Sequence, residues 1–185
     1  MKEFSSTDPH RSQSGLTLIE LVVVAALSVI VAAVAIPMFV NGLRNWRLAG
    51  DARAIASQLA LTRMRAANEF TQAELSIDTS GGTFQIKIYN KTSSTFVTEG
   101  GVFNLSSGNS FGYGALSTPA GTQTTIAVSN PIIFNSRGIP ITATGTPTGT
   151  YAIYLTDSNG GFFAVTVSPA SDVNIWKYSG GWVQM

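Results

Sequence analysis

The sequence predicts an α+β fold in which one long N-terminal helix, transmembrane in its first half and amphipathic in its second, precedes an antiparallel, β-sandwich-like domain. Two observations carry this prediction. Residues 21–40 form an uncharged apolar run, and apolar residues continue beyond it at helical spacing. From about Ser76 onward, short alternating segments are separated by Gly, Ser, Thr, Asn and Pro, which is typical of strands and turns. A chain of 185 residues leaves room for one modest globular domain after such a helix.

The apolar run is long enough to cross a membrane as a helix. No charged residue lies between Glu20 and Arg44, and only Ser28 and Pro37 interrupt the apolar character of residues 21–40. About 20 apolar residues suffice to span a hydrocarbon core. Placing a carboxylate near the centre of a bilayer costs roughly 2.5–3.5 kcal/mol of free energy. Glu20 directly precedes the apolar run, so it is a functional-site candidate that needs a partner.

The apolar run also has three alternative interpretations. A buried helix of a soluble core fits poorly, because so long an uncharged run favours a membrane span. A plain membrane anchor would leave Met1 in place. A secretory signal peptide could be cut at the A-x-A sequence of residues 33–35, leaving Ile36 first. The apolar run is long for a signal peptide, and Glu20 would then have no role.

The segment after the span is expected to continue the helix. Its apolar positions alternate in steps of four and three, which places them on one helical face. Gly42, Gly50 and Pro37 are weak points where such a helix could bend. The predicted face consists of Leu48, Ala52, Ile55, Leu59, Thr62 and Ala66.

The remainder is expected to contain eight short strands and a last turn at Gly180-Gly181 before Trp182. Residues 157–161 join two apolar runs and predict a hairpin turn. Residues 106–122 are rich in Gly and Ser and predict a loop without a regular element. The expected strands are residues 75–78, 83–89, 96–103, 124–128, 132–134, 150–156, 162–168 and 173–178.

Composition argues against most catalytic and metal chemistry. The chain has no cysteine, and its single histidine is His10. After residue 15 there is neither a His nor a Cys, which excludes Ser-His and Cys-His nucleophile pairs and His-bearing zinc sites there. The carboxylates are scattered, with no spacing that predicts a catalytic pair. We therefore expect no enzyme, no cofactor and no metal site. The net charge of +1 gives no bulk electrostatic case for nucleic acid.

The sequence GLTLIE at residues 15–20, followed by the apolar run, resembles the prepilin leader of type IV pilins and type II secretion pseudopilins. The resemblance implies that a prepilin peptidase cuts between Gly15 and Leu16 and methylates the new N-terminus at Leu16. Members of this family usually have phenylalanine at that position, and leucine is similarly large and apolar. Glu20 becomes the fifth residue of the mature chain, and Pro37 matches a proline of the family. The resemblance thus assigns Glu20 and Pro37 to assembly.

Looser motifs resemble those of the GspH/FimT pseudopilins. They are LALTRMRAA at residues 59–67, IIFNSRGIP at residues 132–140, and the apolar runs of residues 163–169 and 173–176. The implied fold is pilin-like: residues 1–15 are a cleaved leader, 16–40 the transmembrane half of the helix, 41–74 its periplasmic half and 75–185 the globular β domain.

The same resemblance implies a location and partners. The chain would be a single-pass protein of the inner membrane with its C-terminal domain in the periplasm, and would then enter a filament. Its partners would be other pilins or pseudopilins, the prepilin peptidase, the inner-membrane assembly platform and the lipid bilayer. Either a type II secretion pseudopilus or a type IV pilus could be the host filament.

Cleavage would also supply the partner that Glu20 needs. A free amino group at Leu16 has a reference pKa of roughly 7.7–8.0, and methylation to a secondary amine keeps its positive charge. A buried carboxylate is tolerated when it is paired. In a filament built by packing these helices, Glu20 of one subunit could meet the ammonium group of the next. A wrong register would leave a charge unpaired among apolar side chains.

Two alternative functions stay open. Some GspH/FimT proteins bind DNA through a basic G-R-x-R motif near the C-terminus. The last eight residues here contain no arginine, and Lys177 between Trp176 and Tyr178 offers only one cation among aromatic rings. We therefore do not expect nucleic acid as a partner. The other alternative is an anchored or secreted binding domain that never polymerises.

Overall fold

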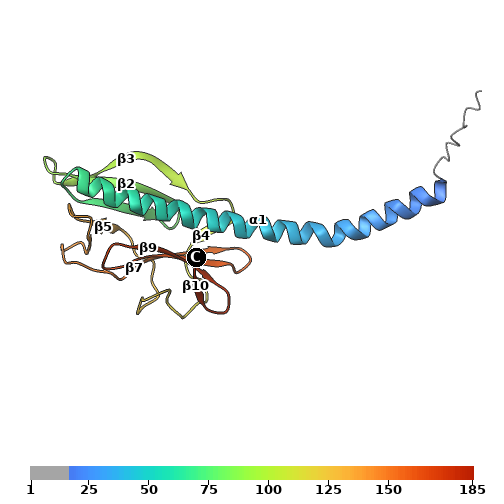
Figure 1. The fold of residues 1–185 in the computed structure, drawn as a ribbon. Coiled ribbons are helices and arrows are strands. Elements are labelled where there is room, and N and C mark those ends of the chain that lie inside the picture. The colour runs from blue at the N-terminus through green and yellow to red at the C-terminus, as the bar shows by residue number, and fades with distance from the viewer. Residues whose placement is uncertain (1–16) are drawn as a thin grey trace, which may run out of the picture. The chain divides into compact units, whose positions relative to one another are not determined.

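The computed structural model describes residues 17–185 of the chain. The predicted cleavage and methylation positions, Gly15 and Leu16, lie outside the described residues. The chain divides into two compact units, residues 1–41 and residues 42–185. Helix α1 (Leu18–Asn68) supplies the described part of the first unit and opens the second (Figure 1).

The end of α1 is fixed by a capping motif, and it comes earlier than the expected boundary at residue 74. The amide of Thr71 donates to the carbonyl of Ala66 (3.2 Å), and that of Phe70 donates to Ala67 (3.3 Å). This pair of bonds is a Schellman motif. Phe70 takes the left-handed position at φ 48°, which glycine normally occupies. The helix therefore stops at Asn68, and the first strand begins at Ala73.

Ten strands follow in two antiparallel sheets of five. The first sheet has the order β3-β2-β1-β5-β6 and the second the order β10-β9-β8-β7-β4. The predicted α+β class is confirmed. In chain order the strands are β1 (Ala73–Asp78), β2 (Thr83–Asn90), β3 (Thr95–Asn104), β4 (Asn109–Phe111), β5 (Ile132–Phe134), β6 (Pro140–Ile141), β7 (Tyr151–Asp157), β8 (Phe162–Val167), β9 (Val173–Tyr178) and β10 (Trp182–Gln184).

The second half of α1 forms the core together with both sheets. All six positions of the predicted helical face are fully buried, at 0% exposure. They belong to one hydrophobic cluster with side chains such as Leu75 of β1, Phe134 of β5, Ile153 of β7 and Val165 of β8, apart from the polar Thr62. The amphipathic prediction for this half of the helix is confirmed. Asp51 joins the buried face, although it is charged.

Four details of the strand prediction were wrong, one of them β10, which pairs with β9 where only a turn before Trp182 was expected. Residues 124–128 form no strand; Ile126 and Val128 instead pack against a small cluster around Tyr154, without a ladder of backbone bonds. The segment predicted to be loop contains β4, whose three residues pair with β7. The two-residue strand β6 pairs with β5 and was not predicted. Strands this short depend on their tertiary partner rather than on local propensity.

Candidate functional site in the N-terminal helix

Glu20 lies in the first turn of α1 and caps the helix. Its Oε2 atom accepts hydrogen bonds from the amide and the hydroxyl of Thr17, both at 3.1 Å. In return, the hydroxyl of Thr17 accepts a bond from the Glu20 amide at 3.3 Å. This reciprocal arrangement is a capping box, with Thr17 as the N-cap and Glu20 three residues later. The T-x-x-E spacing that signals it is visible in the sequence, although no capping box was predicted there.

The capping box leaves part of the carboxylate available. Among the residues that the structure describes, Oε1 of Glu20 accepts no hydrogen bond. One oxygen therefore holds the start of the helix, and the other has no donor among residues 17–185. A carboxylate also suits this end of a helix, because the N-terminal end of the helix dipole is positive.

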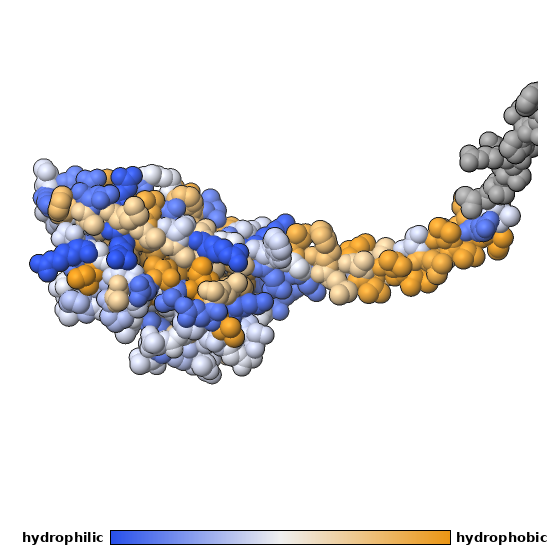
Figure 2. Space-filling view, viewed as in Figure 1, coloured by the Kyte–Doolittle hydropathy of each residue, from blue (hydrophilic) through white to orange (hydrophobic). Residues whose placement is uncertain are grey.

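Glu20 is surrounded by apolar side chains that nothing in the described chain covers. The large apolar residues from Leu18 to Val40 are all exposed in the structure. Figure 2 shows them as hydrophobic side chains along the N-terminal part of α1. By length and composition, α1 contains one segment able to cross a membrane, and none of that segment is buried in the described chain. This is consistent with anchoring in an inner membrane.

Pro37 lies inside α1, seventeen residues after Glu20. Proline has no amide hydrogen, so it cannot donate to the carbonyl four residues earlier, and its ring crowds the preceding turn. The helix nevertheless continues through it to Asn68. Pro37 and Glu20 thus lie on the same continuous helix, and the structure brings neither of them to another functional side chain.

The aromatic residues considered as a nucleic-acid platform are used in packing. The ring nitrogen of Trp176 donates to the hydroxyl of Thr166 at 2.9 Å. Tyr178 makes edge contacts with the rings of Phe162 and Trp182, at centroid distances of 6.3 and 5.3 Å. These contacts hold the rings on either side of Lys177 at the end of the second sheet.

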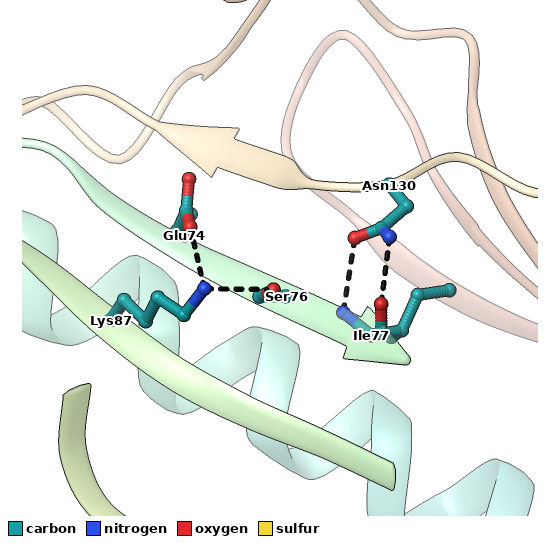
Figure 3. A network of polar contacts seen from close by, with 5 residues as sticks. All are labelled: Glu74, Ser76, Ile77, Lys87 and Asn130. Carbon is teal, nitrogen blue, oxygen red and sulfur yellow. Dashed lines mark hydrogen bonds and ion pairs between the residues drawn. The ribbon is translucent and has the colours of Figure 1, made fainter. Parts of the chain in front are cut away.

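The first sheet contains a small polar network with a structural role (Figure 3). The Nζ atom of Lys87 lies 3.7 Å from Oε1 of Glu74 and donates to the hydroxyl of Ser76 at 3.1 Å. Burial raises the pKa of the Glu74 carboxyl, and Lys87 acts in the opposite direction. No group of three or more His, Cys, Asp or Glu side chains that could hold a metal lies within residues 17–185.

The side chain of Asn130 bonds to the backbone of β1 at a position where no neighbouring strand pairs with that edge. Its side-chain amide donates to the carbonyl of Ile77 at 2.7 Å and accepts from the Ile77 amide at 3.0 Å. Strand β5 pairs with β1 only from Ala73 to Leu75. Asn130 therefore satisfies the backbone of Ile77, two residues beyond the point where that pairing ends.

Comparisons with known proteins agree with this geometry. Residues 10–36 match the family model described as the prokaryotic N-terminal methylation motif. A search of functionally characterised proteins finds no match.

Two solved structures of the minor pseudopilin EpsH from the type II secretion system of Vibrio cholerae are similar to the chain. They share 12% and 11% identity with it, each with a TM-score of 0.50. Each similarity covers 70% of this chain, and the two cover 95% and 92% of the solved chains. The chain thus combines the methylation motif with a pilin-like fold.

Proposed function

We propose that this pilin-like protein is a minor pseudopilin. It would be a membrane-anchored subunit that assembles through α1 into the pseudopilus of a type II secretion system. A type IV pilus is the alternative host filament. The observation that carries the proposal is the combination of the two similarities. The methylation motif covers the start of the chain, and the likeness to a minor pseudopilin extends over 70% of it. The exposed apolar half of α1 supports the proposal, because such a surface needs lipid or other helices around it.

In this proposal a prepilin peptidase cleaves between Gly15 and Leu16 and methylates Leu16. Residues 16–40 then cross the inner membrane, with the domain in the periplasm, and an assembly platform in that membrane transfers the subunit into the filament. Pro37 would let the helix adjust its path between the membrane and the filament, because it removes one backbone bond.

Glu20 would pair with the N-terminal ammonium of a neighbouring subunit. The capping box supports this role, because it orients the carboxylate at the first turn and leaves Oε1 without a donor from the described chain. A charge-assisted bond to an ammonium is about twice as strong as a neutral bond. A subunit added in the wrong register would leave Glu20 unpaired among apolar side chains, so the pair would favour one register.

Assembly can be tested by fractionation of cells that produce the chain with the peptidase and the other subunits of one filament system. Glu20→Gln keeps the shape of the side chain and removes its charge, so we expect at least a tenfold loss from sheared filaments with normal recovery from membranes. The matched control is Glu69→Gln, which removes an exposed charge beyond the end of α1. If both variants enter filaments like the wild type, pairing of Glu20 is wrong. If the wild type itself stays in the membrane fraction, the chain is an anchored domain that does not polymerise.

A further inference from the structure

A small polar hollow lies at the start of the unit formed by residues 42–185. Its volume is about 240 Å³. Arg44 and Arg47 of α1 line one side, and residues 107–109, Asp157 and Ser158 line the rest. Arg44 is half-buried, whereas Arg47 is exposed. Nothing in the proposed assembly mechanism uses this hollow.

One wall of the hollow is held in place by a buried carboxylate. Asp51, only 8% exposed, accepts bonds from the amide and hydroxyl of Ser106, at 2.9 and 2.8 Å, and from the side-chain amide of Asn109 at 2.6 Å. Arg44, Arg47 and Asp51 follow one another at helical spacings of three and four, which places them on one side of α1. Asp51 therefore fixes the turn of residues 106–109 beside the two arginines.

The turn itself is well defined. The Asn109 amide donates to the Ser106 carbonyl at 3.0 Å, and Gly108 has φ 88°, a conformation that favours glycine. Asn109 also pairs with Asp157 across strands β4 and β7. Oδ1 of Asp157 accepts from the amides of Asn159 and Gly161 at 2.9 and 2.7 Å, which holds the adjoining hairpin turn. Both walls of the hollow are thus tied to regular structure.

The two arginines have no acidic partner in the described chain. The ion pairs within residues 17–185 are Arg65 with Glu99 and Lys87 with Glu74. Two guanidinium groups and the carboxylate of Asp157 give the lining residues a net charge of +1. The buried carboxylate of Asp51 behind the wall brings the sum for the region to zero, but its bonds go to Ser106 and Asn109 rather than to the arginines. The hollow therefore offers guanidinium donors to an anion that carries about one negative charge.

We propose that this hollow binds the phosphodiester of an anionic phospholipid. Arg44 and Arg47 follow Val40, the last residue of the expected span, by four and seven residues. An α-helix rises about 1.5 Å per residue, so they lie roughly 6 and 10 Å beyond the span, close to the headgroup layer, which is about 5–8 Å thick. Trp46, 82% exposed, lies between them in the sequence and is a residue type enriched at membrane interfaces. The inference rests on the membrane-spanning part of the proposed function and is independent of filament assembly.

The chemistry of the lining favours a lipid over free phosphate. A phosphodiester carries one negative charge, which matches the lining, whereas free phosphate near pH 7 carries between one and two. The headgroup must leave the lipid with a net negative charge, because a cationic headgroup would cancel the attraction to the arginines.

The proposal can be tested by native mass spectrometry of the full-length protein. The protein is reconstituted in nanodiscs with equal amounts of phosphatidylglycerol and phosphatidylcholine and transferred to detergent, and the retained lipids are identified. We expect phosphatidylglycerol to be retained in preference. Arg44→Gln/Arg47→Gln should lower that preference about 30-fold, from the usual contribution of two arginines near an anionic surface. Circular dichroism checks that each variant is folded.

The matched control is Arg53→Gln/Arg137→Gln, which removes the same charge elsewhere. Arg53 lies nine residues, or about 14 Å, further along α1 than Arg44, beyond the headgroup layer. Asp51→Ala separates geometry from charge. It makes the region more positive, so bulk attraction would strengthen phosphatidylglycerol retention, whereas loss of the fixed turn should weaken it.

Retention that falls in Arg44→Gln/Arg47→Gln and in Asp51→Ala, but not in the control, supports the site. Equal loss in both double variants, or no loss in either, overturns it. Displacement of the lipid by millimolar inorganic phosphate also overturns it, because the hollow would then be a site for free phosphate. Filament assembly enters none of these measurements, so its failure and the failure of the lipid site can be told apart.

Discussion

Truncation of Leu59 should destabilise the domain far more than truncation of Leu61, two residues away. Leu59 is completely buried in the cluster between α1 and the sheets, whereas Leu61 is 38% exposed. A buried Leu→Ala change removes transfer free energy and leaves a cavity, and costs about 2–5 kcal/mol. At Leu61 water can occupy the vacated space, so we expect a cost of about 1 kcal/mol or less.

The assay is thermal unfolding of the full-length protein in detergent, followed by near-ultraviolet circular dichroism. For a domain of this size, 1 kcal/mol shifts the Tm by about 2–4 °C. Leu59→Ala should therefore lower the Tm by roughly 4–20 °C, and Leu61→Ala by about 4 °C at most. Similar shifts for the two variants would refute the packing of this face of α1 against the sheets.

Two further predictions concern the end of the helix and the polar network. Phe70→Gly should raise the Tm by a few degrees, because glycine removes the strain of about 1–2 kcal/mol that the left-handed backbone conformation imposes on Phe70. The Phe70 side chain is 77% exposed, so its loss removes little packing. Phe70→Ala keeps the strain, and an equal gain in Tm from alanine would contradict this reasoning. Burial raises the pKa of the Glu74 carboxyl in the folded state. The stability that this group contributes should therefore be complete below the ordinary carboxyl pKa of about 4.3. That contribution should be lost as the pH rises through the raised pKa of the folded state. Urea titrations at several pH values should show this fall and its absence in Glu74→Gln; an unchanged pH profile in the variant would assign the dependence to other groups.

The sequence predicts the helical part of the fold well because its apolar residues follow a single period. All six residues of the predicted buried face are buried. Asp51 shares their spacing, but a charged residue is normally expected to be exposed. Its burial depends on donors from Ser106 and Asn109, more than fifty residues away, and no local pattern shows them.

The strands were predicted less completely, for a related reason. Ile126 and Val128 alternate as in a strand, yet they form no ladder of backbone hydrogen bonds. The bonds from this segment to β7 are made by Ser129, which pairs with Ala152. Strand β4 lies in a Gly/Ser-rich segment and exists through its pairing with β7. In both cases the deciding contact comes from a distant part of the chain.

The candidate site at Glu20 was predicted from the sequence in part. The GLTLIE sequence points to Glu20, and the structure adds the capping box with Thr17, which depends only on local spacing. The ammonium partner that we propose for Glu20 belongs to a processed neighbour. Neither the sequence nor the structure of a single chain contains it, so this pairing remains a prediction.

The measurement that tests the central claim most directly is mass spectrometry of the N-terminus of the mature protein, purified from cells that contain a prepilin peptidase. The account predicts a chain that begins at Leu16 and carries one methyl group on its amine. A chain that begins at Ile36 would indicate ordinary secretion, and a chain that retains Met1 would indicate a plain membrane anchor. Either of these results would contradict the account, because the ammonium group proposed to pair with Glu20 would never form.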